Sequence, residues 1–200
     1  MRFSSPVVAL CLACAAAPAA AQERLSSWFV GVTGALASFR GGAAEVNLGL
    51  AAQPSQAIGG ALSVGRRFGA WEVGVEAGFT TTHVEVVTDG ASLENRSEGL
   101  DRLRFALLAG YRLARIGSAS IHARVGPVLD YWSVDGEDGR TVLGSEGRLV
   151  VSTRLGPVDV ENAFGLGRTE SPFESGDLPP GYVRRGLTVW SLATGLRIGL

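Results

Sequence analysis

Two histidines, His83 and His122, are the candidates in this sequence for acid–base chemistry near neutral pH. His83 stands in the stretch TTTHVEV and His122 in SIHAR. Neither begins a His-x-Ser pattern, and general acid–base catalysis needs a second group within hydrogen-bond reach. The residues therefore predict no catalytic site, and a histidine satisfied inside a folded structure is the simpler interpretation of His122.

Arginines and carboxylates form a larger candidate set. All 18 basic residues are arginines, and 19 acidic residues bring the net charge to −1. No basic tract accompanies this balance, which excludes nucleic acid as a partner. The planar guanidinium binds a carboxylate with two parallel hydrogen bonds, so ion pairs are the expected chemistry. The set comprises Arg102, Arg104, Arg112, Arg124, Arg148, Arg154 and Arg197, with Glu72, Glu76, Asp130, Asp159 and Glu161.

The first residues predict a cleaved signal peptide over 1–21. Arg2 supplies the positive charge, an apolar run of secretory length follows, and an A-x-A site precedes Gln22. The alternative, a lipoprotein signal ending at Cys14, lacks the Leu expected three residues earlier. Both cysteines leave with the signal, so the mature domain, 22–200, has no disulfide, cysteine nucleophile or cysteine zinc site.

No metal or other cofactor is predicted either. The acidic stretches at 135–139 and 174–177 lack the twelve-residue ligand loop of a calcium site. We interpret both stretches as solvated loop tips.

Eight segments of period two must position the charged set. Alternating polarity over nine or more residues indicates strands, because a helix would bury positions i, i+3 and i+4. Short connections near 67–69, 115–118 and 156–157 alternate with long polar ones at 40–56, 88–99, 135–145 and 168–185, which predicts an up-and-down sheet. The segments are 27–39, 57–68, 71–79, 102–113, 119–132, 147–155, 158–166 and 187–200.

Alternation fits two barrels, a soluble one with the apolar phase inside and a membrane one with the apolar phase facing lipid. The polar phase is crowded with Gly, Ala and Ser and interrupted by Arg and Glu, which suits the narrow interior of an eight-stranded barrel. No mid-strand position of the apolar phase is charged. Asn162 is the one polar residue that does not fit this apolar phase. Aromatic residues cluster toward both strand ends, as at two membrane surfaces. We therefore predict an all-β, eight-stranded antiparallel up-and-down transmembrane β-barrel.

These features resemble the small outer-membrane β-barrel proteins of Gram-negative bacteria, the class of the OmpA transmembrane domain and OmpX. The resemblance covers about residues 26–200 and implies an outer-membrane monomer in contact with lipid and lipopolysaccharide, with its loops outside. It also implies recognition by the outer-membrane assembly machinery through the last strand. That family usually ends in an aromatic residue, from which Leu200 departs. The lipid-facing residues of this strand are Trp190, Leu192, Leu196, Ile198 and Leu200.

The expected function is structural, with a surface-interaction role and no enzyme activity. The charged set would fill the lumen as a plug, and lining a narrow pore is the alternative. A hydrophobic-solute transporter is a further alternative. The last alternative is a lipid A-modifying enzyme, since some barrels of this size have that activity.

Overall fold

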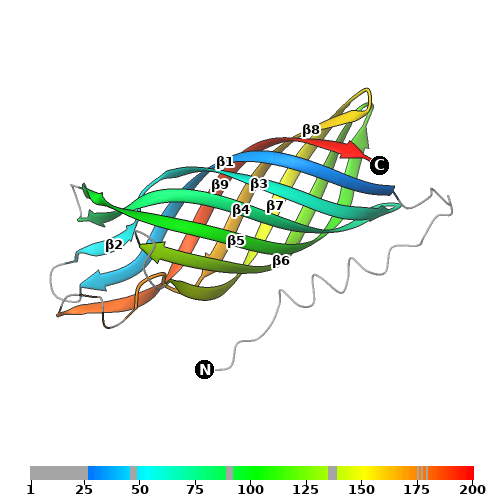
Figure 1. Cartoon of the computed structure of the whole chain (residues 1–200). Coiled ribbons are helices and arrows are strands. Elements are labelled where there is room, and N and C mark those ends of the chain that lie inside the picture. Colours follow the sequence, from blue (N-terminus) through cyan, green and yellow to red (C-terminus); the bar gives the residue numbers. More distant parts are fainter. Residues whose placement is uncertain are drawn as a thin grey trace, which may run out of the picture.

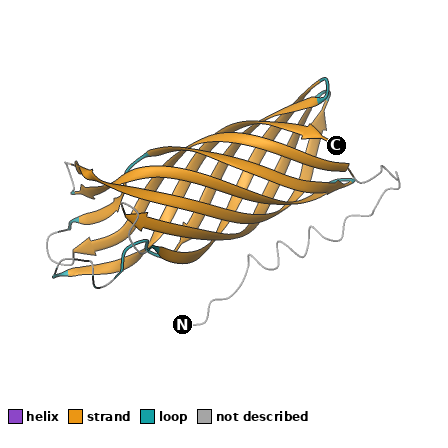
Figure 2. Cartoon of the chain, in the orientation of Figure 1, coloured by secondary structure: helices purple, strands orange, loops and turns teal. Residues whose placement is uncertain are grey.

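The computed structural model describes residues 27–45, 49–88, 92–134, 139–174, 176, 178 and 180–200, without the side chains of 94–98 and 134. These residues form one closed barrel of strands (Figure 2). Within these ranges, no helix is long and apolar enough to cross a membrane. The predicted signal peptide, 1–21, lies outside the described residues.

Eight antiparallel strands close the ring in sequence order, and the first pairs with the last (Figure 1). The eight-stranded up-and-down prediction is therefore confirmed. The described strands, including one short extra strand, are β1 (Ser27–Glu45), β2 (Ala51–Pro54), β3 (Ala57–Phe68), β4 (Trp71–Val87), β5 (Ser92–Ile116), β6 (Ala119–Val134), β7 (Arg140–Leu155), β8 (Val158–Thr169) and β9 (Tyr182–Gly199).

The short strand β2 continues the line of β3 and does not widen the ring. Both strands pair with β1 on one side and with β4 on the other. Ser55 and Gln56 interrupt the line between them. There the backbone N–H of Ser55 donates to the carbonyl of His83 at 2.7 Å, so the ladder to β4 is kept.

The three short connections lie at one end of the barrel, which we call the short-turn end (Figure 1). Each contains a glycine with positive φ, at Gly69, Gly117 and Gly156. Glycine adopts this conformation without steric cost, which allows the tight reversal. The three predicted short turns are confirmed.

The predicted long loops are wrong in extent, because strands take up much of them. β1 runs on to Glu45, β4 to Val87, and β5 begins at Ser92. β7 and β9 likewise start earlier than predicted. The ladders continue because neighbouring strands supply hydrogen-bond partners there, whatever the polarity of the side chains.

The outer face of the barrel changes polarity along its height. Large apolar side chains between two aromatic levels are exposed on this face, and we call them the apolar belt; in β4 it runs from Trp71 to Phe79. Beyond Phe79, the next outward residue of β4 is Thr81, which pairs with Asp101. Outward polar residues continue around the barrel at Arg40, Ser133, Thr141, Arg168 and Thr188.

The inner face changes in the opposite sense at the same level. Beyond the belt the interior holds a buried apolar cluster, which we call the apolar plug. Because successive residues of a strand face opposite sides, this change needs no break in the strands. The plug comprises Ala37, Phe39, Ala57, Leu100, Trp132, Val142, Leu187 and Val189.

Candidate functional site: the barrel lumen

Between the apolar plug and the short-turn end, charged side chains from β4 to β9 meet inside the barrel. Their side chains point inward, because each occupies the same set of alternate positions in its strand as the small residues. We call the group the ion-pair lattice. Its arginines are Arg104, Arg124, Arg148 and Arg197, and its carboxylates are Glu72, Glu76, Glu146 and Glu161.

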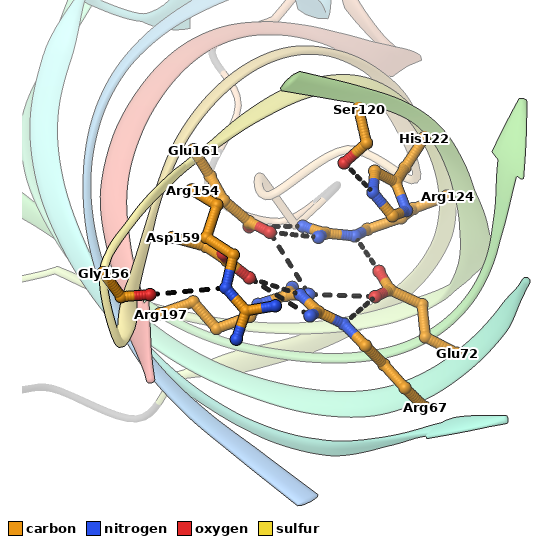
Figure 3. Close-up of polar contacts among 10 residues, drawn as sticks. All are labelled: Arg67, Glu72, Ser120, His122, Arg124, Arg154, Gly156, Asp159, Glu161 and Arg197. Atoms are coloured by element: carbon orange, nitrogen blue, oxygen red, sulfur yellow. Dashed lines mark hydrogen bonds and ion pairs between the residues drawn. The ribbon is translucent and has the colours of Figure 1, made fainter. Parts of the chain in front are cut away.

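Glu72 accepts from three arginines (Figure 3). Arg124 donates its Nε–H to Oε1, and Arg197 donates to Oε2 from Nη1 at 2.9 Å. Arg67 donates to Oε2 at 3.5 Å. The Glu72 side chain is only 5% exposed, so its charge depends on these partners.

Glu161 joins two of the same arginines from β8 (Figure 3). Arg124 donates to it through both terminal nitrogens, at 2.9 and 2.7 Å. Arg197 Nη1 lies 3.2 Å from Glu161 Oε1. The guanidinium of Arg197 also lies 3.9 Å from the ring centre of Phe29, a cation–π contact. This part of the lattice therefore ties β4, β6, β8 and β9 together.

A second part of the lattice centres on Arg148. It donates to Glu76 from Nη1 at 2.7 Å and from Nη2 at 2.5 Å. Its Nε–H donates to Glu146 at 2.8 Å. Arg104 forms an ion pair with the same Glu146.

A separate ion pair, between Arg102 and Asp130, lies beside the apolar plug, with Nη2 donating to Oδ2 at 2.7 Å. The Arg102 guanidinium is 5.6 Å from the ring centre of Phe39 and 5.2 Å from that of Trp132. These two rings pack edge to face at 5.7 Å. The charged and apolar parts of the lumen are thus in direct contact.

Two predicted members, Arg112 and Arg154, stay outside the lattice. Among the described residues neither has an ion pair. Both line a cavity of about 190 Å³ at the short-turn end. Asp159, by contrast, accepts from Arg67 at 3.1 Å.

Sequence reasoning missed three interior residues. Glu146 lies one position before the predicted strand 147–155, and extending that strand would have shown its parity with Arg148. Arg67 lies near the end of the predicted strand 57–68, now β3, but was not among the predicted lumen residues. Phe29 faces inward and is 3% exposed, in a phase where mainly small residues with some charged ones were expected. The signal for all three was the same alternation carried one or two residues further.

The two histidines lie toward opposite ends of the barrel. The backbone of His83 lies opposite Gly99, beyond the apolar belt. His122 Nε2 is 2.9 Å from Ser120 Oγ, a pairing that the search for His-x-Ser overlooked because the order is Ser-x-His (Figure 3). Nδ1 of His122 is buried and has no hydrogen-bond partner among the described residues, so no carboxylate of these residues completes a triad. In the described part of the chain, no group of three possible ligands could hold a metal ion.

The predicted lipid-facing residues of the last strand are all exposed. Trp190, Leu192, Leu196 and Ile198 expose 43–60% of their surface on the outer face. Leu200 follows the end of β9 and donates its N–H to the carbonyl of Trp28 at 2.9 Å. The backbone ladder to β1 therefore includes the residue where an aromatic was expected.

Space in the middle of the lumen is small. The cavity bordered by lattice residues such as Glu72, Glu76 and Arg148 measures about 40 Å³. A water molecule occupies roughly 30 Å³ of the liquid. The middle of the lumen is therefore filled by side chains.

No protein-family model matches the chain, and no curated protein matches it by sequence. Solved structures do match. Neisserial surface protein A aligns with a TM-score of 0.61 at 15% identity, covering 88% of this chain and 99% of its own. The outer-membrane protein OprG of Pseudomonas aeruginosa gives 0.53 at 14% identity, covering 88% and 95%. A major outer-membrane protein of Thermus thermophilus gives 0.53 at 16% identity, covering 88% and 100%. The resemblance to outer-membrane β-barrels is therefore confirmed for the fold.

Proposed function

We propose that this chain, which has the fold of the outer-membrane β-barrels, is itself an integral outer-membrane protein with a structural and surface-interaction role. Its lumen acts as a closed core. The observation that carries the proposal is the reversal of polarity along the outer face of the barrel. Apolar side chains cover one band of this face, and polar ones follow at the next outward positions.

The apolar belt has the dimensions of a membrane-spanning band. Trp71 to Phe79 of β4 is nine residues, and a tilted transmembrane strand needs about 9–11. Arg66 stands at the aromatic level of the short-turn end, its guanidinium 5.7 Å from the ring centre of Trp28 and 5.1 Å from that of Phe68. Asn162 is exposed within the belt, the exception that the sequence already singled out. This band supports contact with lipid on the outside of the barrel.

The filled lumen supports a structural role over a transport role. The ion-pair lattice and the apolar plug lie one above the other along the barrel axis. A solute would have to displace both, because the lattice contacts close the middle and the plug closes the far end. The lattice is the counterpart of the core that a soluble protein buries.

The strand extensions beyond the belt support a surface-interaction role. These extensions stand at the end opposite the short turns and carry polar side chains, and in the proposed orientation they lie outside the membrane. One protein of the same fold is named a surface protein. We propose contacts with lipopolysaccharide for this part, and recognition by the assembly machinery for β9.

A pair of arginine substitutions on β4 tests the membrane orientation. Val75→Arg places a charge in the middle of the belt, where it costs roughly 2–4 kcal/mol in lipid. Thr81→Arg places the same charge beyond the aromatic level, where the cost is near zero to about 1 kcal/mol. We expect Val75→Arg to impair folding into phosphatidylcholine vesicles, scored by heat-modifiable gel mobility, and Thr81→Arg to fold like the parent chain.

The opposite result would overturn the proposal. If the barrel were soluble, Val75→Arg would replace an exposed apolar residue by a charged one in water and would improve solubility. A parent chain that fractionates with soluble periplasmic protein and lacks the mobility shift would have the same meaning.

A further inference from the structure

We propose that the cavity at the short-turn end is a binding site for a tetrahedral oxyanion of the phosphate type. This cavity, of about 190 Å³, lies on the side of the ion-pair lattice away from the apolar plug. It is several times the roughly 30 Å³ of one water molecule, so it can hold a small ion and its hydration. Its lining comes from β1, from β3 to β8 and from the turns after β3 and β5.

The lining has more cationic groups than anionic ones. Four arginines border the cavity against two carboxylates, Glu72 and Asp159. Both carboxylates are already engaged, Glu72 by three arginines and Asp159 by Arg67. The unpaired charge of the lining is therefore positive, and Arg112, Arg115 and Arg154 carry it.

These three guanidinium groups have no carboxylate partner among the described residues. Within the described ranges, the Arg115 side chain donates only to the carbonyl of Gly117, at 3.4 Å, and that of Arg154 only to the carbonyl of Gly156, at 3.3 Å. Both contacts are long for N–H···O hydrogen bonds, which cluster near 2.9–3.0 Å. Most of the donor groups at this end therefore remain available.

His122 provides an independent sign of a ligand. The side chain lines the cavity and is only 6% exposed. Ser120 lies beside Nε2, while Nδ1 is buried and has no hydrogen-bond partner among the described residues. Native structures seldom keep a buried polar atom without a partner. In the proposed complex the imidazole turns toward the cavity, so that a phosphate oxygen accepts from Nδ1–H.

Three adjacent strands bring donor side chains to this cavity. Arg112 lies on β5, Ser120 and His122 on β6, and Ser152 and Arg154 on β7. In the proposed complex, donors from these strands share the oxygens of a tetrahedral phosphate. Guanidinium groups bind phosphate oxygens through two parallel hydrogen bonds, and hydroxyl groups complete the shell. Inorganic phosphate and the phosphate of a lipid headgroup share this chemistry.

Titration of the whole refolded barrel with inorganic phosphate, in a non-ionic detergent, is the first arm of the test. We expect saturable heat for the parent chain and at least tenfold weaker binding for the double variant Arg112→Gln, Arg154→Gln. Neither arginine has an ion pair to lose among the described residues, so the variant should keep its heat-modifiable mobility. Arg168→Gln is the matched control, because it removes an exposed charge at the other end of the barrel.

The second arm distinguishes a lipid source. Parent and double variant are placed in nanodiscs of phosphatidylcholine with a minor share of phosphatidylglycerol, extracted, and examined by native mass spectrometry. Selective retention of phosphatidylglycerol by the parent alone assigns the site to a headgroup, whereas phosphate binding without retention assigns it to the free ion. A folded parent chain that shows neither, or a double variant that equals the parent in both arms, contradicts the proposal.

Discussion

Arg148 on β7 and Glu76 on β4 form a two-fold hydrogen-bonded ion pair, with N···O distances of 2.7 and 2.5 Å. β5 and β6 separate these strands in the ring, so the pair crosses the lumen and does not run along the wall. Backbone ladders fix each strand only to its two neighbours. Cross-lumen pairs of this kind fix the distance between opposite walls.

The Arg148–Glu76 pair should show strong coupling in a double-mutant cycle. Arg148→Met or Glu76→Leu alone leaves one charge buried without this partner, and we expect each to cost about 3 kcal/mol in urea unfolding from lipid vesicles. The double variant should lose less than the sum, because no lone charge remains. Additive losses would mean that the two side chains stabilise the barrel independently.

Glu72 should be the most sensitive carboxylate of the lattice. Glu72→Gln removes the charge that Arg67, Arg124 and Arg197 share, and the expected loss is about 3–5 kcal/mol of unfolding free energy. Glu170→Gln is the control, because Glu170 is 63% exposed and its pair with Arg140 spans 3.6 Å. An exposed pair of this kind contributes less than about 1 kcal/mol. Equal losses for the two variants would disprove the central place of Glu72.

Conductance should appear only when both closures of the lumen are removed. We expect no stepwise current from the parent chain in a planar bilayer, and none when Glu72, Glu76, Arg124 and Arg148 are all replaced by Ser, because the apolar plug remains. Adding Trp132→Ala removes the largest side chain of the plug, and this combined variant should conduct. Regular current steps from the parent chain would instead favour the pore alternative.

Two glycines should respond oppositely to alanine. A Cβ at Gly126 would collide with the carbonyl of Leu107 on the neighbouring strand, and Leu108 Cα lies 3.2 Å away. We expect Gly126→Ala to cost about 2 kcal/mol by overpacking. Gly34→Ala meets no atom within 4 Å, so it should be neutral or stabilise by up to about 1 kcal/mol. The measurement is the temperature at which each variant loses the gel mobility of the folded barrel. An unchanged temperature for Gly126→Ala would contradict this close approach of β5 and β6.

Much of the fold follows from the sequence because period-two alternation depends on nothing but the geometry of a strand. The pattern from Trp71 to Phe79 identifies both the strand and its outward face. The three short turns follow in the same way from glycine and the ends of the patterns. The number of strands in the ring, and the side of the charged residues within the predicted alternating segments, were therefore accessible.

The extent of the strands and the partners of the charged side chains could not be predicted from the sequence. Beyond the belt the apolar side chains turn inward, as at Leu187 and Trp132, so a rule that equates apolar with outward fails there. Alternation also gives the side of a residue but not its height in the barrel. Height depends on the stagger between strands, which brings Arg148 to Glu76 and leaves Arg112 and Arg154 at the short-turn end.

The pairing of β1 with β9 also constrains how the molecule can assemble. It joins Phe29 to Gly199, so among the described strand pairings the one with the greatest sequence separation is also the one that completes the cylinder. Loop closure of this length is slow, because its entropy is lost before the contact forms. Until β9 arrives, β1 has an unsatisfied row of backbone groups that an apolar solvent tolerates poorly. Maturation therefore requires either a catalyst that shelters β1 or a concerted final step in which insertion and closure coincide.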